Sequence, residues 1–422
     1  MKVFKFGGAS VKSAEAIENI ALLLKNYAPT KVVVIVSAMG KMTNALEKIL
    51  HAWYNNEDYT ERFSEVKNFH LAILQQLFPD MSHPIYSKVN HYFQELEKQV
   101  SATPSGNFDY DYDQIVSFGE LLSSTIIADY LCEKNFNCHW CDVRNLIITD
   151  ENWREGNVNW KRTEQAINKQ AQTIFANNEQ PQIILTQGFL GGTENNCTTT
   201  LGREGSDYTA AIFSYALNAD EMVVWKDVDG ILNADPKIFS DTILLPHISY
   251  GEAIELTYYG ATVIHPKTIK PLQNKKIPLH VRSFLNPESV GTLITETAEV
   301  ENNIPSYIVK TDQLLLSISP KNFSFIAEQS LSEIFTAFAH AGIRINMTQN
   351  SAISFTACIS NDQQRIKILF EKLSDNFSIK YNSDLQLITI RHWTTEAIEK
   401  MICGKKVLLE QRNRTTAQMV LK

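Results

Sequence analysis

The feature that most constrains this chain is residues 183–207, where an apolar segment runs through a glycine-rich loop into the start of a helix. Ile183 to Leu185 are consecutive apolar residues and predict a short buried strand. The glycines that follow allow the backbone to turn or to approach another group closely, and they are Gly188, Gly191 and Gly192. The stretch therefore predicts a strand–loop–helix unit.

The second half of this stretch places an arginine beside a helix N-terminus. Within G-R-E-G-S-D (202–207), Ser206 is predicted to cap a helix that continues to Asn218. A helix N-terminus offers free N–H groups and a positive dipole end, and Arg203 adds a guanidinium, so a carboxylate or phosphate ligand is favoured. The alternative is an ordinary capped helix without a ligand, which the glycines alone do not exclude.

Similar units occur twice in the first fifty residues. Residues 2–6 predict a strand that ends in Gly7-Gly8-Ala9-Ser10, and Val32 to Val36 predict a central parallel strand that ends in Ser37-Ala38-Met39-Gly40. Strands and helices alternate up to about residue 290, so we expect an α/β three-layer sandwich with a mostly parallel sheet. Ligands of such sheets bind at the carboxyl ends of the strands, where these loops lie.

Further along the chain, two features place polar groups near these loops. Glu120 lies in a largely apolar helix predicted over 114–132, although a solvated glutamate is the simpler alternative. An acid-rich loop, residues 226–236, follows a strand predicted at 221–225. Residues 102–113 are expected to form a surface loop.

The pattern changes after a predicted linker at 296–305. Residues 306–383 predict β-α-β-β-α-β, a ferredoxin-like unit, and residues 384–422 predict a second, shortened copy whose sheet the strand 306–310 could complete. The expected domains are therefore a first domain over 1–295 and two smaller α+β units.

Composition limits the partners. The 422 residues carry a net charge of −8 and no long Lys/Arg cluster, which argues against nucleic acid or an anionic membrane as the main partner. No signal peptide and no apolar run of about 20 residues is evident, so a cytoplasmic location is expected.

Seven short motifs together resemble aspartate kinases, which have the amino-acid-kinase fold and C-terminal ACT domains. In order, they are K-F-G-G-A-S (5–10), V-S-A-M-G-K-M-T-N (36–44), F-G-E (118–120), G-F-L-G-G-T (188–193), G-R-E-G-S-D (202–207), K-D-V-D-G-I-L-N-A-D-P (226–236) and V-I-H-P-K-T-I (263–269). The resemblance implies transfer of the ATP γ-phosphoryl group to the β-carboxylate of L-aspartate. This is the first step toward lysine, threonine and methionine.

The resemblance also assigns residues. Lys5 and Asp207 are expected to be catalytic, with Asp207 orienting Lys5 toward the phosphates. The aspartate-binding residues are expected to be Ser37, Thr43, Glu120, Arg203 and Ser206. The nucleotide, with Mg²⁺ held mainly by its phosphates and not by a protein metal site, is expected to contact Lys5, Gly7, Gly8, Ser10, Gly191, Lys226, Asp227, Asp235, Pro236 and Lys237. His265 is expected to be structural or near ATP.

Three positions depart from the family. Ala9 stands where threonine is usual, Lys226 where threonine or serine is common, and Thr262 where many members have lysine, so one phosphate contact is either missing or supplied by Lys226. The chain ends at residue 422, so no fused homoserine dehydrogenase is expected.

Two other functions stay open. The first is a kinase for another small acid on the same fold, against which the F-G-E helix and the paired ACT units argue. The second is a kinase-dead amino-acid sensor, against which the retention of Lys5, Arg203 and Asp207 argues.

Regulation is expected at the ACT units, through which we also expect a homodimer because their short sheets leave an open edge. The residues that resemble the effector loop are Asn346, Met347, Asn350 and Ser351. Lysine-sensitive relatives often place an acid where Asn346 stands, so we expect threonine, or weakly lysine, as the effector. The alternative is that Asn346 only caps a turn.

Overall fold

The computed structural model describes residues 1–27, 30–176, 182–261, 264–297, 304–322 and 324–422. The chain forms two compact units. The first contains Met1–Ile231, Leu244–Ile254 and Val263–Glu301, and the second contains Leu232–Ile243, Glu255–Thr262 and Asn302–Lys422. The second unit thus includes two segments that precede residue 295 in the sequence. The expected domain boundaries near residues 295 and 305 stay a prediction.

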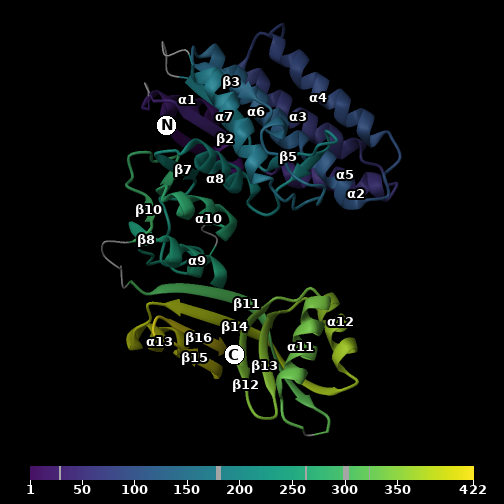
Figure 1. Cartoon of the computed structure of the whole chain (residues 1–422), viewed down its shortest axis with the longest axis vertical. Helices are drawn as coiled ribbons and strands as arrows, with labels where there is room; N and C mark the ends of the chain where they lie inside the picture. Colours follow the sequence, from purple (N-terminus) through teal and green to yellow (C-terminus); the bar gives the residue numbers. More distant parts are fainter. Residues whose placement is uncertain (28–29, 177–181, 262–263, 298–303, 323) are drawn as a thin grey trace. The chain divides into compact units, whose positions relative to one another are not determined.

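The first unit is organised by an eight-stranded sheet in the order β3-β4-β2-β1-β7-β9-β10-β8 (Figure 1). Every pairing in it is parallel except β10 with β9, so the predicted mostly parallel sheet is confirmed. The strands are β1 (Lys2–Phe6), β2 (Val32–Val36), β3 (Asn137–Cys141), β4 (Gln182–Gln187), β7 (Glu221–Lys226), β8 (His247–Ser249), β9 (Leu279–Ser283) and β10 (Thr292–Thr295). A short hairpin pairs β5 (Leu190–Gly192) with β6 (Thr198–Thr200).

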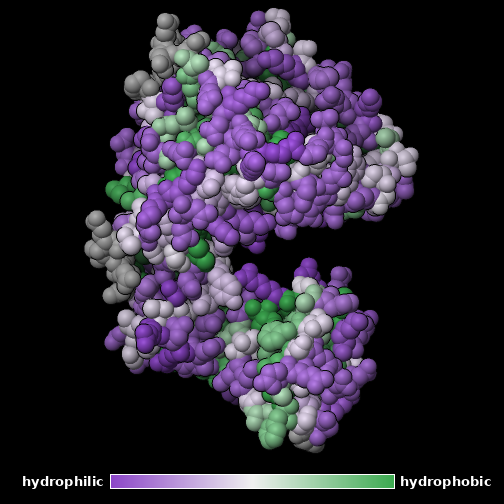
Figure 2. Space-filling view, viewed as in Figure 1, coloured by the Kyte–Doolittle hydropathy of each residue, from purple (hydrophilic) through white to green (hydrophobic). Residues whose placement is uncertain are grey.

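Helices cover both faces of this sheet, as a three-layer sandwich requires. Side chains alternate between the faces of a strand. In β1, Lys5 reaches helix α8 on one face, while Phe4 packs on Tyr27 after α1 on the other. On the face shown in Figure 2, the unit's surface is mainly hydrophilic. The helices of this unit are α1 (Ala14–Lys25), α2 (Met42–Tyr54), α3 (Thr60–Leu77), α4 (Pro84–Val100), α5 (Phe108–Val116), α6 (Phe118–Glu133), α7 (Trp160–Phe175), α8 (Gly205–Leu217) and α10 (Pro266–Lys275). Helix α9 (Tyr250–Tyr259) is divided between the two units after Ile254.

Two expectations about the first unit's helices are wrong. The predicted surface loop 102–113 contains the start of α5, which forms because the Asn107 side chain accepts hydrogen bonds from the first N–H groups of the helix. Ser206 does not cap α8. The helix begins at Gly205, after Glu204 with a left-handed φ of 55°.

One stretch of the described residues, Phe108–Glu133, is long and apolar enough to cross a membrane by length and composition alone, and it comprises α5 and α6. Its most apolar window is 89% buried inside the protein, which is typical of a core helix.

The second unit is built on a six-stranded sheet in the order β12-β13-β11-β14-β16-β15. Residues 306–320 and 377–391 each form one long strand where two separate strands were expected, and the segment Ser306–Lys310 pairs with Leu387–Arg391. Its strands are β11 (Ser306–Pro320), β12 (Ile345–Asn350), β13 (Phe355–Ser360), β14 (Phe377–Arg391), β15 (Val407–Arg412) and β16 (Thr416–Leu421). Its helices are α11 (Glu328–His340), α12 (Gln363–Leu373) and α13 (Thr395–Ile402).

Candidate active site

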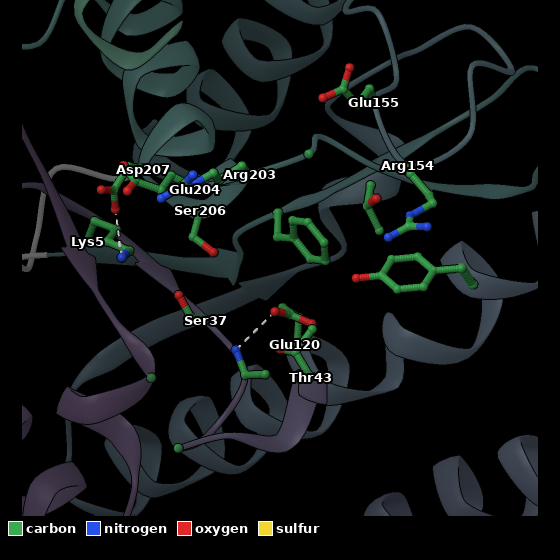
Figure 3. Close-up of a pocket in the computed structure, with 18 residues that line it drawn as sticks. Lys5, Ser37, Thr43, Glu120, Arg154, Glu155, Arg203, Glu204, Ser206 and Asp207 are labelled. Atoms are coloured by element: carbon green, nitrogen blue, oxygen red, sulfur yellow. Dashed lines mark hydrogen bonds and ion pairs between the residues drawn. The ribbon is translucent and has the colours of Figure 1, made fainter. Parts of the chain in front are cut away.

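A cavity of about 700 Å³ lies in the first unit, where β1, β2 and β4 end and α8 begins (Figure 3). Eight residues assigned from sequence line it together, and they are Lys5, Gly8, Ser37, Thr43, Glu120, Arg203, Ser206 and Asp207. The rest of the lining is Ala38, Gly40, Tyr112, Arg154, Glu155, Phe189, Thr200, Gly202, Glu204 and Gly205. Residues as far apart in sequence as Lys5 and Asp207 thus meet at the carboxyl edge of the sheet.

The basic centre of the cavity is Lys5, whose Nζ lies 2.6 Å from Oδ1 of Asp207. Both side chains are almost fully enclosed, with 12% and 4% of their surface exposed. Burial raises the pKa of Asp207, but the ammonium groups of Lys5 and Lys226 outweigh it and leave that pKa below its usual value. Asp207 is therefore an anion at neutral pH, and it fixes the lysine in one position.

The loops after β1 and β2 pack closely beside this lysine. The Gly40 N–H donates to the Gly8 carbonyl at 2.9 Å. A Cβ on Gly8 would lie 2.6 Å from the Gly40 carbonyl oxygen and 3.0 Å from that of Ala38. Only glycine fits at position 8, so the backbone of both loops stays accessible at the cavity wall.

Glu120 presents an unsatisfied carboxylate oxygen at the cavity. It lies in the first turn of α6 with 2% of its surface exposed, and its Oε1 accepts the Ala38 N–H at 3.2 Å. Its Oε2 is buried and has no hydrogen-bond partner. Burial raises the pKa of Glu120 to about 8, against the lowering effect of backbone N–H groups. A cation brought to Oε2 would remove this penalty.

The loop before α8 supplies Arg203, which is exposed and makes no ion pair with any described residue. The next residue, Glu204, accepts the backbone N–H of His265 at 3.0 Å. His265 itself caps α10, because its Nδ1 accepts the Lys267 N–H at 3.2 Å. Burial, ahead of the nearby charges, lowers the pKa of His265. His265 thus acts as a helix cap, and its expected place near ATP stays a prediction.

Several residues assigned to the nucleotide do not line this cavity. Gly191 lies in β5 opposite Thr199, and Ser10 donates to the carbonyl of Trp225 at 3.3 Å. The others are Gly7, Lys226, Asp227, Asp235, Pro236 and Lys237. The last three of these belong to the second compact unit, and Thr262 lies outside the described residues.

Ten lining residues were not assigned from sequence, and Tyr112, Arg154, Phe189 and Thr200 are among them. Of these four, Arg154 and Phe189 have left-handed backbone, with φ values of 65° and 70°. Neither the positive φ values nor the position of Arg154 at the cavity can be predicted from the sequence. Phe189 and Thr200 do lie inside the glycine-rich stretch 183–207.

The predicted effector residues lie on or beside β12. Asn346 is inside the strand, so the alternative that it caps a turn is wrong. Its Oδ1 accepts from Lys310 Nζ at 2.8 Å, and its Nδ2 donates to Gln313 Oε1 at 2.9 Å. Met347 is buried in the core, Asn350 is exposed, and Ser351 hydrogen-bonds Ser354 at 2.7 Å.

Among the described residues, no group of three or more His, Cys, Asp or Glu side chains could hold a metal ion. Asp207 pairs with Lys5, and Glu204 bonds the His265 backbone.

Comparison with known proteins gives consistent results. Residues 1–283 match the Amino acid kinase family. The chain is 33% identical to the chloroplastic aspartokinase 1 of Arabidopsis thaliana, over 84% of its own length and 62% of that protein. It is 30% identical to the lysine-sensitive aspartokinase 3 of Escherichia coli, over 83% of its own length and 76% of that protein. The match thus spans less than two thirds of the plant aspartokinase.

Solved structures extend the likeness to the whole chain. E. coli aspartokinase III in complex with aspartate and ADP (R-state) superposes with a TM-score of 0.83 at 24% identity, covering 100% of this chain and 96% of that one. The same enzyme in complex with lysine and aspartate (T-state) gives a TM-score of 0.81 at 25% identity, covering 100% of this chain and 95% of that one.

Proposed function

This chain belongs to the amino acid kinase family and, within it, to the aspartokinases, and on that premise we propose that it phosphorylates the β-carboxylate of L-aspartate. The products are 4-phospho-L-aspartate and ADP. One observation carries the proposal: a buried glutamate with an unpaired oxygen, Glu120, lines the same cavity as the buried Lys5–Asp207 ion pair. Glu120 can bind the ammonium group of an acceptor, and Lys5 can bind the phosphates of ATP during phosphoryl transfer.

The chemistry needs no general base. The β-carboxylate of aspartate is ionised at neutral pH and is itself the nucleophile. Catalysis then consists of positioning and of stabilising charge on the transferring phosphoryl group. Lys5, held by Asp207, supplies positive charge there, and the backbone around Gly8 supplies N–H groups.

The acceptor is held by charge pairs. Glu120 takes the ammonium of aspartate, and this contact returns Glu120 to its ionised form. Arg203 has the planar donors to bind a carboxylate with two parallel hydrogen bonds. Ser37, Thr43 and Ser206 complete the polar wall of the pocket.

ATP enters as a co-substrate with Mg²⁺, which the nucleotide phosphates hold. ADP is present in the complex of E. coli aspartokinase III. On the protein side, the proposed contacts beyond the cavity lie in the first unit and are Gly7, Ser10, Gly191, Lys226 and Asp227, while the nucleotide contacts of Asp235, Pro236 and Lys237 stay predictions from sequence. The influence of Lys226 on the pKa of Asp207 supports its proximity to this end of the site.

Regulation, assembly and location are part of the proposal. The lysine bound to E. coli aspartokinase III supports an amino-acid effector site. In this chain the amide of Asn346 favours threonine, or weakly lysine. A homodimer formed through the second unit, in the cytoplasm, completes the proposal.

The test is nucleotide turnover. The chain is incubated with MgATP and a panel of amino acids and small acids, and ADP release is followed by a coupled assay. We expect release with L-aspartate far above that with L-glutamate, acetate or carbamate. Preference for another acid would favour a kinase for another small acid on the same fold, and no turnover with any acceptor would favour a kinase-dead amino-acid sensor.

A further inference from the structure

A pair of cysteine thiols lies in the first unit, at the turn that joins α6 to β3 (Figure 1). Cys132 is in the last turn of α6, and Cys138 follows the first residue of β3. The Cys132 thiol donates to the Cys138 carbonyl oxygen at 3.4 Å, and the Cys138 thiol donates to the Cys132 sulfur. Neither residue lines the cavity, and the proposed function uses neither.

Backbone hydrogen bonds hold the turn between the two cysteines. The Asn135 N–H donates to the Cys132 carbonyl oxygen at 2.9 Å, and the Phe136 N–H donates to that of Leu131 at 3.0 Å. Asn135 has φ 62°, a left-handed conformation that asparagine adopts more readily than most residues. The chain therefore reverses direction here and brings the start of β3 back beside the end of α6, so the two thiols meet.

The spacing C-x-x-C at 138–141 does not form the pair. Side chains alternate along a strand, so Cys138 and Cys141 point to opposite faces of β3. Cys141 is buried, and its sulfur accepts a hydrogen bond from Gln170 Nε2, on α7, at 3.6 Å. The partner of Cys138 is therefore Cys132, on the neighbouring helix.

The two thiols differ in reactivity. The hydrogen bond from Cys138 lowers the pKa of Cys132 to about 7, and the ammonium of Lys88 acts in the same direction, while burial and Asp129 oppose them. The same hydrogen bond raises the pKa of Cys138 well above its usual value, together with burial and the charges of Cys132, Cys141 and Asp129. The thiolate is the reactive form of cysteine. Cys132, whose side chain is exposed, is therefore the nucleophile of the pair.

We propose that Cys132 and Cys138 form a reversible dithiol–disulfide site that reacts with peroxides. The Cys132 thiolate attacks one oxygen of hydrogen peroxide, the O–O bond breaks, and the other oxygen leaves as hydroxide, which solvent protonates to water. Cys132 is then a sulfenic acid. The Cys138 sulfur attacks the sulfenic sulfur, and the hydroxyl group leaves with the Cys138 proton as a second water.

The electrons balance in both directions. The two thiols lose two electrons when the S–S bond forms, and hydrogen peroxide gains two as it becomes two waters. A dithiol reductant reverses the reaction by thiol–disulfide exchange and becomes a disulfide itself. The site is independent of phosphoryl transfer.

The experiment maps the oxidation state of each cysteine by peptide mass spectrometry. Wild type, Cys132→Ser and Cys138→Ser are treated with hydrogen peroxide, with and without dimedone to trap sulfenic acid. Free thiols are then alkylated with iodoacetamide, before or after reduction with dithiothreitol. Cys403 is the internal control, because it is an exposed cysteine at the end of α13 to which no other described thiol donates. Circular dichroism verifies that each variant is folded.

We expect wild type to form a Cys132–Cys138 disulfide that dithiothreitol removes. Cys138→Ser should instead carry dimedone on Cys132, and Cys132→Ser should leave Cys138 reduced. In untreated wild type, alkylation of Cys132 should have its midpoint near pH 7. At that pH it should be at least about threefold faster than alkylation of Cys403, because its larger thiolate fraction outweighs the lower nucleophilicity of a more acidic thiol.

Three results overturn the inference. Cys132 reacts no faster than Cys403, or wild type accumulates sulfenic acid on Cys132 without a disulfide, or Cys138 pairs with Cys141. Each result is read from the cysteines themselves, so it leaves the proposed function as it stands. A wild type without aspartate kinase activity would likewise leave the dithiol site as it stands.

Discussion

The ammonium of Lys5, near the end of strand β1, lies 2.6 Å from the carboxylate of Asp207 in the first turn of α8. About two hundred residues separate the two in the chain, and both side chains are largely enclosed, with 12% and 4% of their surface exposed. The pair fixes a positive charge at the carboxyl edge of the sheet, beside the loop that follows β1.

Removing this charge should affect turnover more than substrate binding. Lys5→Ala is expected to lower kcat by at least about 100-fold, because Lys5 meets charge that grows in the transition state. The aspartate KM should change by less than about threefold. Steady-state kinetics measures both, with Lys2→Ala as the control, since Lys2 lies on the same strand, pairs with Glu221 and does not line the cavity. A folded Lys5→Ala variant with ordinary kcat would remove Lys5 from the reaction.

Aspartate binding should release a proton near pH 7. The pKa of Glu120 is about 8 in the free protein, so its carboxyl is mainly protonated at pH 7 and must ionise to receive an ammonium. Below pH 8 the affinity should therefore rise about tenfold per pH unit. Calorimetry in buffers of different ionisation enthalpy gives the proton count, and Glu120→Gln should abolish release and weaken binding. Glu133→Gln, at the end of the same helix, serves as the control. Proton release unchanged in Glu120→Gln would refute the assignment.

The same pKa has a consequence for stability. A carboxyl whose folded pKa is raised stabilises the fold below its unfolded pKa, and this contribution is lost as the pH rises through the folded value, here about 8. The ligand-free protein should therefore lose thermal stability between pH 6 and pH 9, and Glu120→Gln should lose less. Equal slopes for wild type and Glu120→Gln in thermal unfolding would contradict the raised pKa.

Asn346 provides a test in the second unit. Lys310 donates to its Oδ1, and burial, together with the charge of Arg344, lowers the pKa of Lys310. No described carboxylate forms an ion pair with Lys310. Asn346→Asp should thus gain a charge pair, raising stability by about 0.5–1 kcal/mol, and it should confer no strong lysine inhibition because Lys310 occupies the new carboxylate. Denaturant unfolding and inhibition assays check both, with Asn382→Asp as the control, since Asn382 is exposed on β14 and is not a predicted effector residue. Destabilisation, or strong new lysine inhibition, would show that Lys310 does not engage residue 346.

The sequence predicted those site residues that lie in short local motifs, and it missed those whose position depends on residues far away in the chain. Lys5 and Glu120 each lie in a recognisable short motif, K-F-G-G and F-G-E, so the sequence was enough to predict that both belong to the site. Arg154 has no such pattern, because its place depends on a left-handed backbone and on Asp113, forty-one residues earlier.

The strands β11 and β14 were each predicted as two shorter strands, and both errors have the same physical cause. Asp312 and Asp384 have left-handed φ values of 53° and 58°, and the sequence around them was taken to separate two strands. The pairing of β11 with β14 continues past both positions with shifts in register, so each strand is one long element. The length of each strand is set by pairing with residues distant in sequence, and such pairing leaves no local sequence pattern.

The identity of the phosphorylated product tests the central claim most directly. The chain is incubated with MgATP and L-aspartate in the presence of hydroxylamine, which converts an acyl phosphate to a stable hydroxamate that mass spectrometry identifies. The account predicts L-aspartate β-hydroxamate, dependent on ATP and nearly absent with Lys5→Ala. ATP turnover without this hydroxamate, or a hydroxamate formed preferentially from another acid, would contradict it.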